Sequence, residues 1–163
     1  MAQKMFIFAL CSVALLGAAA IAQPTPTVGK DGWVMVTAAD LAGTPDLAMR
    51  QKDTFNLQAS ADFDGDLLED RVSVRKNARL AQYGVFACLA RADAGPCNDM
   101  MITSGPMKHL SNLGVNAVAA ATPECGKMAA RGTPACIEVF AFEASSTLYR
   151  WNGSKFVERQ VTD

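Results

Sequence analysis

Acidic residues crowd one short stretch of the sequence, residues 61–74, which reads ADFDGDLLEDRVSV. Positions 1, 3, 5 and 9 of the run that starts at residue 62 are all aspartates: Asp62, Asp64, Asp66 and Asp70. Hard cations such as calcium bind about six to eight oxygen atoms, and alternate carboxylates followed by a tight turn can converge on one ion. The spacing therefore predicts a calcium-binding loop.

Three leucine and glutamate positions within this loop refine the prediction. Leu68, at position 7, would contribute its backbone carbonyl oxygen, and Glu69 would point to solvent. Leu67 stands at position 6, where glycine is usual because that position tends to adopt a positive φ. A β-carbon there costs about 1 kcal/mol or more. We therefore expect Leu67 either to weaken the site or to make the loop turn differently.

The acidic loop has two other interpretations. It could be a solvated turn that keeps a sheet edge soluble, neutralised by the basic residues that follow it: Arg71, Arg75, Lys76 and Arg79. It could also be an EF-hand, but position 12 is then Ser73 instead of the bidentate glutamate, and RVSVR alternates like a strand. The EF-hand is excluded on these grounds, and the aspartate spacing favours a metal site over the solvated turn.

The D-x-D-G-D-x-x-x-D pattern, which follows a predicted strand and leads into RVSV, resembles the calcium loop of FG-GAP and VCBS-type repeats. That resemblance covers only the loop and its flanks. It implies calcium held for structure, with the four loop aspartates as ligands. Such repeats are strand–loop–strand units of extracellular proteins, and the chain holds one copy, which is too few for a propeller. Residues 125–163 are also similar to the C-terminal half of small, uncharacterised exported bacterial proteins, which bears on location and fold.

The first 30 residues are expected to lie outside the folded domain. Residues 1–22 have a charged start at Lys4, an apolar run and the small-residue pattern Ala20-Ile21-Ala22, which is typical of a secretory signal peptide cleaved after Ala22. Residues 23–30, QPTPTVGK, form a predicted flexible linker, and residues 31–163 form one domain. The sequence thus predicts export to the periplasm or the medium.

Five cysteines occur, and Cys11 would leave with the signal peptide. An even set remains for disulfides in an exported chain: Cys88, Cys97, Cys125 and Cys136. These four allow three connectivities, and we favour the local one, 88 with 97 and 125 with 136, because each pair brackets a Gly/Pro segment that can reverse the chain. A four-cysteine zinc site is disfavoured because no Cys-x-x-Cys occurs.

Residue patterns predict a mainly β fold with antiparallel sheet and one or two short α-helices near the N-terminus, within residues 37–53; an α+β fold is the alternative. Strands are expected at 33–36, 55–59, 71–75, 83–90, 100–103, 136–144, 146–151 and 155–161. Residues 107–121 fit a short helix or a strand. Asn152-Gly153 predicts a hairpin turn in which both central residues take positive φ.

No pattern in the sequence predicts an enzyme. His109 is the only histidine, and no nucleophile elbow, P-loop or dinucleotide-binding glycine motif occurs. Removing Lys4 leaves 14 basic and 16 acidic residues, a net charge of −2, which argues against a nucleic-acid partner and against an anionic membrane surface after cleavage. We therefore expect an exported non-catalytic protein with structural calcium. The alternative is a protein-binding module, such as an inhibitor or adhesion protein, that uses the Cys125–Cys136 loop or the aromatic hairpin near Trp151.

Overall fold

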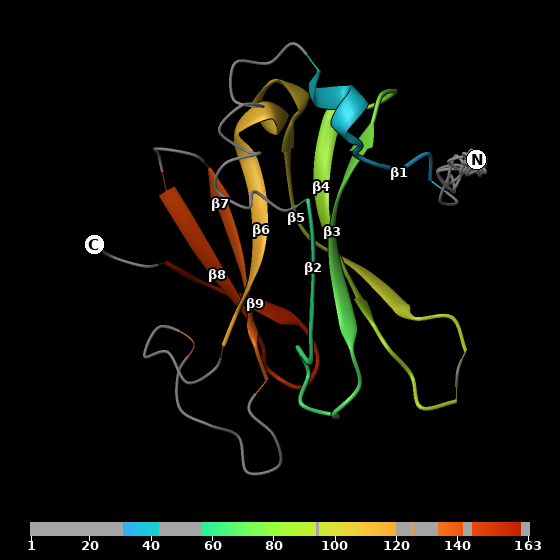
Figure 1. Ribbon diagram of the computed structural model, residues 1–163, viewed down its shortest axis with the longest axis vertical. Helices are drawn as coiled ribbons and strands as arrows, with labels where there is room; N and C mark the ends of the chain where they lie inside the picture. Colours follow the sequence, from blue (N-terminus) through green and yellow to red (C-terminus); the bar gives the residue numbers. More distant parts are fainter. Residues whose placement is uncertain are drawn as a thin grey trace, which may run out of the picture.

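A computed structural model describes residues 31–42, 57–93, 95–119, 125, 134–141 and 145–160. The predicted signal peptide, the linker and the second predicted helix, within residues 44–53, lie outside these residues. The described chain is mainly β and forms two antiparallel sheets (Figure 1). The predicted fold class is therefore confirmed.

The first sheet is built around one long strand, β3. Its members are β1 (Val34–Met35), β2 (Gln58–Ala61), β3 (Asp70–Asn77), β4 (Gln82–Leu89) and β5 (Asn98–Pro106). The order is β1-β3-β4-β5, and β2 pairs with the opposite end of the same edge of β3 that carries β1. The second sheet is a simple meander in the order β6-β7-β8-β9. Its strands are β6 (Leu113–Val118), β7 (Cys136–Ala141), β8 (Ser145–Trp151) and β9 (Phe156–Gln160).

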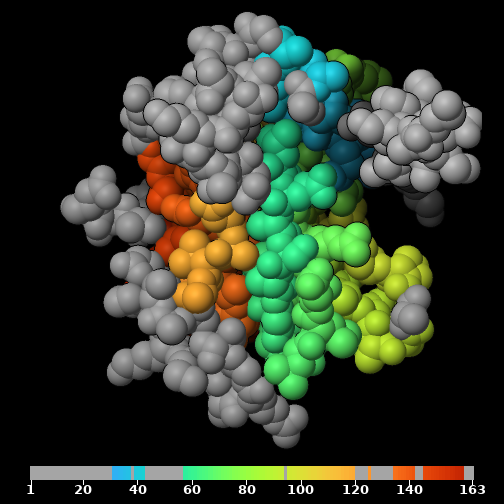
Figure 2. Space-filling view, in the orientation of Figure 1, coloured from blue at the N-terminus to red at the C-terminus, as the bar shows by residue number. Residues whose placement is uncertain are grey.

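One hydrophobic core joins the two sheets. Alternate residues of β3 and β4, such as Val72, Val74 and Val85, are fully buried, and so are Val115 and Ile137 of the second sheet. All of them belong to a single cluster of contacting side chains. Burying each such side chain contributes about 1.5–3 kcal/mol. The sheets also meet edge to edge where β2 lies beside β6, as the space-filling view shows (Figure 2).

The helices of the described chain are short 3-10 helices, so the α-helical type predicted within residues 37–53 is corrected for the part that the structure describes. Helix η1 spans Ala38–Leu41, and the carboxylate of Asp40 accepts the backbone N–H of Thr37 at 2.8 Å. This is the capping contact that the Thr37/Asp40 spacing predicts. At Ala42, just before Gly43 and Pro45, the backbone leaves the helical conformation, with φ −58° and ψ 130°. The helix therefore ends after four residues.

The ambiguous segment 107–121 contains both of the structures that its sequence allows. Helix η2 spans Met107–Asn112, and β6 follows directly at Leu113. The predicted hairpin after Trp151 is also present, but its geometry differs from the expectation. Gly153 has φ 99°, whereas Asn152 is not among the residues with positive φ, and the loop runs over four residues to Lys155. The side chain of Asn152 closes the turn instead, since Oδ1 accepts the backbone N–H groups of Ser154 and Lys155, both at 3.0 Å.

Candidate metal centre

The acidic loop joins two paired strands at one end of the first sheet (the lowest green turn in Figure 1). β2 ends at Ala61, which pairs with Asp70, the first residue of β3. The eight residues between them therefore form a hairpin loop whose two ends are held together by the ladder. This is the strand–loop–strand arrangement that the sequence predicts for residues 61–74.

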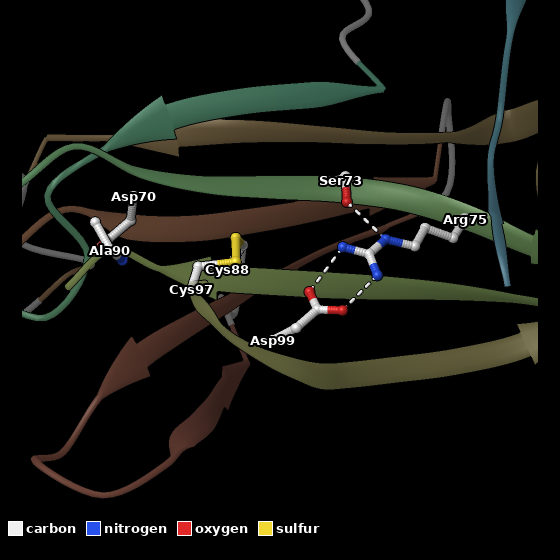
Figure 3. Close-up of a disulfide and its surroundings, with 7 residues drawn as sticks. All are labelled: Asp70, Ser73, Arg75, Cys88, Ala90, Cys97 and Asp99. Atoms are coloured by element: carbon white, nitrogen blue, oxygen red, sulfur yellow. Dashed lines mark hydrogen bonds and ion pairs between the residues drawn. A yellow bond between two sulfur atoms is a disulfide. The ribbon is translucent and has the colours of Figure 1, made fainter. Parts of the chain in front are cut away.

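Asp70 anchors the loop to the rest of the sheet. It is completely buried, and both of its carboxylate oxygens accept backbone hydrogen bonds. Oδ2 accepts the N–H of Phe63 at 2.8 Å. Oδ1 accepts the N–H of Ala90 at 2.7 Å, and Ala90 lies just beyond the end of β4 (Figure 3). One carboxylate thus ties the start of the loop to the end of a strand 20 residues further along the chain.

Phe63 is a second anchor, which the sequence analysis missed. Its side chain is fully buried in the main core although its neighbours Asp62 and Asp64 are acidic. The signal was available in the sequence, because a large aromatic residue inside an otherwise acidic loop indicates a side chain that turns inward. The hydrogen bond from Ala90 to Asp70 could not be predicted from the sequence, since any residue with a backbone N–H could donate it.

The remaining loop aspartates fold the backbone around their own side chains. Asp62 accepts the N–H of Gly65 through Oδ1 at 2.6 Å and the N–H of Leu67 through Oδ2 at 3.0 Å. Asp64 and Asp66 each accept the N–H two residues further on, at 3.1 and 2.8 Å. The bonds of Asp64 and Asp66 are Asx-turns, whereas those of Asp62 reach three and five residues further on. Together they explain how a short loop can reverse so tightly.

Three of the four predicted aspartate ligands come together. One carboxylate oxygen from each of Asp62, Asp64 and Asp70 lies within 4.8 Å of the others. Asp66 is exposed and does not belong to this group, and its role as a ligand stays a prediction. The same holds for the carbonyl oxygen of Leu68, a half-buried residue whose N–H donates to Asp66.

The local electrostatics disfavour ionised carboxylates. Desolvation, followed by the negative charges of Asp70, Asp66 and Asp62, raises the pKa of Asp64 from 3.8 to about 6, although the N–H of Asp66 partly offsets them. Desolvation also raises the pKa of Asp70, against the lowering effect of its two backbone hydrogen bonds. A cation at the convergence point would reverse both effects because it stabilises the charged forms.

Two of the four basic residues that could neutralise the loop, Arg75 and Lys76, form ion pairs elsewhere. Arg75 forms two bonds to Asp99, at 2.5 and 2.7 Å, and Lys76 pairs with Asp40. Within the described ranges, no lysine or arginine forms an ion pair with a loop aspartate. The solvated-turn interpretation relied on such pairing across the hairpin, so this arrangement favours the metal interpretation.

Leu67 adopts the conformation that the loop pattern requires of glycine. Its φ is 72°, and its side chain is 76% exposed, so no packing holds it there. Gly65, two residues earlier, has φ 84°. The backbone therefore has positive φ at position 6 of the loop, and the leucine bears a conformational cost of about 1–2 kcal/mol.

Four cysteines form the local pairs that the sequence analysis favoured. Cys88 joins Cys97 and Cys125 joins Cys136, with Cα–Cα distances of 5.3 and 5.7 Å. Two such pairs indicate a location outside the cytoplasm. Among the described residues, no helix is long and apolar enough to cross a membrane.

Of the two surfaces predicted for a protein partner, only the aromatic hairpin lies among the described residues. Residues 126–133, inside the Cys125–Cys136 loop, lie outside the described residues. In the hairpin, Tyr149 is a core residue, and Trp151 packs on Phe156 with ring centroids 5.2 Å apart. His109 is exposed in η2.

Comparisons of the chain with protein-family models, with curated proteins and with solved structures found no match.

Proposed function

We propose that this is an exported, non-catalytic protein in which residues 62–70 bind Ca²⁺ for structural purposes. One observation carries the proposal: carboxylate oxygens of Asp62, Asp64 and Asp70 converge within 4.8 Å, and no basic side chain of the described chain pairs with them. An all-oxygen donor set of this kind suits a hard cation.

The proposed site would act on stability through the residues that surround the ion. Asp62, Asp64 and Asp70 would bind it directly, and Asp66 and the Leu68 carbonyl would complete the shell. Desolvation, and after it the repulsion between the carboxylates, raises the pKa of Asp64 and Asp70, and a bound cation would offset both effects. Because Asp70 also holds Phe63 and Ala90, the ion would strengthen the junction of β2, β3 and the end of β4. Calcium would then stabilise the fold by mass action.

Calorimetric calcium titration of the oxidised mature protein, paired with thermal melting, tests this proposal. We expect a saturable heat signal and a melting temperature that rises with calcium concentration. Asp64→Ala should abolish both, yet it should fold, because its ionised carboxylate is unfavourable in the metal-free loop. Asp93→Ala is the matched control, since Asp93 is an exposed acid that pairs with Arg91 outside the loop, and it should retain both signals.

Two results would overturn the proposal. One is the absence of heat and of any melting shift up to millimolar calcium in the unmodified protein. The other is a signal that survives in Asp64→Ala, which would place the ion elsewhere.

A further inference from the structure

The two disulfides sit in different surroundings. Cys125 and Cys136 are buried against Leu148 in a small apolar cluster. Cys88 and Cys97 are half-buried and lie beside a carboxylate, that of Asp99 (Figure 3). One atom from each of these three residues, the two Sγ atoms and a carboxylate oxygen, lies within 4.8 Å of the others.

Asp99 is held in place by a network of its own. Arg75 donates two hydrogen bonds to the Asp99 carboxylate, at 2.5 and 2.7 Å. The guanidinium of Arg75 is fixed in turn, because its Nε donates to Ser73 Oγ at 3.2 Å and its Cζ lies 4.5 Å from the centre of the Phe86 ring. Metal-binding carboxylates are typically oriented by such outer hydrogen bonds.

The strand ladder keeps Cys88 and Cys97 together without help from the sulfur–sulfur bond. In the pairing of β4 with β5, Cys88 lies opposite Asp99 and Leu89 lies opposite Asn98, the neighbour of Cys97. The Cα atoms of the two cysteines are 5.3 Å apart. Two thiolates on one tetrahedral zinc ion, each about 2.3 Å from the metal, lie within about 4 Å of each other, which side-chain rotation across this separation can provide.

We propose that reduction of the Cys88–Cys97 disulfide creates a site for a thiophilic divalent cation of the zinc type, with Cys88, Cys97 and Asp99 as ligands. A dithiol reductant supplies two electrons and two protons, breaks the sulfur–sulfur bond and leaves as its own disulfide. The cation then displaces the two thiol protons and binds two thiolates and one carboxylate, with water in the fourth position. Arg75 balances the remaining negative charge and positions Asp99.

This inference does not depend on calcium binding, and its donor set is chemically distinct from the aspartate loop. Thiolates select soft or borderline cations, whereas the loop offers oxygen alone. The oxidised protein should therefore bind no zinc at Cys88 and Cys97, whether or not the aspartate loop binds calcium.

Cobalt titration tests the site, because Co²⁺ bound to thiolate gives charge-transfer absorption. The full-length mature chain is reduced with a dithiol, freed of reductant under nitrogen and titrated with Co²⁺ alone, followed by competition with Zn²⁺. We expect one equivalent to bind, about two protons to be released per ion at pH 7, and no signal from the oxidised protein. Arg75→Gln should weaken binding by about 10–100-fold, and Asp99→Asn should weaken it at least as much.

The second disulfide provides the control. The double variant Cys125→Ser/Cys136→Ser should keep the cobalt signal. If that variant does not fold, alkylation mapped by peptide mass spectrometry decides the question in the unmodified chain, where Zn²⁺ should protect Cys88 and Cys97 but not Cys125 and Cys136. The proposal is wrong if the reduced protein gives no thiolate–cobalt absorption, if Asp99→Asn binds as tightly as the parent, or if protection falls on the second pair.

Discussion

The acidic loop at residues 62–70 and the hairpin turn at residues 152–155 use the same device to reverse the chain. In each, a side-chain oxygen at the start, from Asp62 or Asn152, accepts backbone N–H groups two to five residues further on. Each also contains one glycine with positive φ, Gly65 or Gly153. Side-chain hydrogen bonds together with one glycine at positive φ are therefore sufficient to close such a turn.

The acidic loop has further features that the hairpin turn lacks and that are not needed to reverse the chain. It carries three converging carboxylates, of which those of Asp64 and Asp70 have raised pKa values, and a leucine at φ 72°. One of the three, Asp70, is buried. In the hairpin turn, the neutral side chain of Asn152 accepts the backbone N–H groups, so the turn closes without converging charges. The difference teaches that the first loop is built around charge, and it motivates the proposed cation.

Replacing the buried anchor should give the largest effect. Asp70→Ala leaves the N–H groups of Phe63 and Ala90 without their acceptor, and each unsatisfied buried donor costs about 1–3 kcal/mol. We expect the free energy of unfolding, measured with urea in the presence of chelator, to fall by about 2–4 kcal/mol. Asp70→Asn, whose amide oxygen can still accept, should lose less. Equal stability of Asp70→Ala and the parent would show that the anchor is unimportant.

The matching change in the hairpin turn should be smaller and independent of calcium. Asn152→Ala removes the side-chain acceptor of an exposed turn, where water can replace the lost bonds. We expect a loss of about 1 kcal/mol, measured by urea unfolding at zero and at saturating calcium. A loss that changes with calcium would contradict the separation of the two loops.

Glycine at the strained leucine should stabilise the acidic loop. Leu67→Gly relieves a positive φ at an exposed residue, and the gain is partly offset by glycine's greater unfolded-state freedom. We expect a gain of about 0.5–1 kcal/mol and tighter calcium binding by calorimetry. Ala81→Gly, at the other non-glycine residue of the described chain with positive φ, is the control: it should gain similar stability with no change in calcium affinity. Equal effects of both variants on affinity would remove the link between strain and binding.

The smallest expected effect is a pH dependence confined to the acidic loop. The pKa of Asp64 is raised from 3.8 to about 6, so between these values the native state binds more protons than the unfolded state. The contribution of this group to stability is therefore greatest below pH 3.8 and falls as pH rises toward 6. Chemical unfolding in the presence of chelator should show that the free energy of unfolding falls less with rising pH in Asp64→Asn than in the parent protein. Saturating calcium should remove the fall, and a fall of the same size in both proteins would assign it to another group.

Much of the fold could be predicted because it rests on local patterns. Alternation along residues 71–75 and the apolar run at 83–90 predicted the strands that became β3 and β4. Predictions were weaker where a few residues fit two structures, as in the 3-10 turn at residues 38–41 and in the mixed segment 107–121. There, a helix of one turn and a strand differ by little in local energy, and packing decides between them.

The candidate site divides in the same way. The aspartate spacing by itself predicted a tight loop, in which three of the four aspartates converge. The Gly/Pro segments between cysteines favoured the pairing that the structure has, because these contacts join residues close in sequence. Only the tertiary structure decided that Asp70 is buried against Ala90 and that Arg75 pairs with Asp99, 20 and 24 residues apart. Such contacts depend on strand register, which is a property of the assembled sheet and its core.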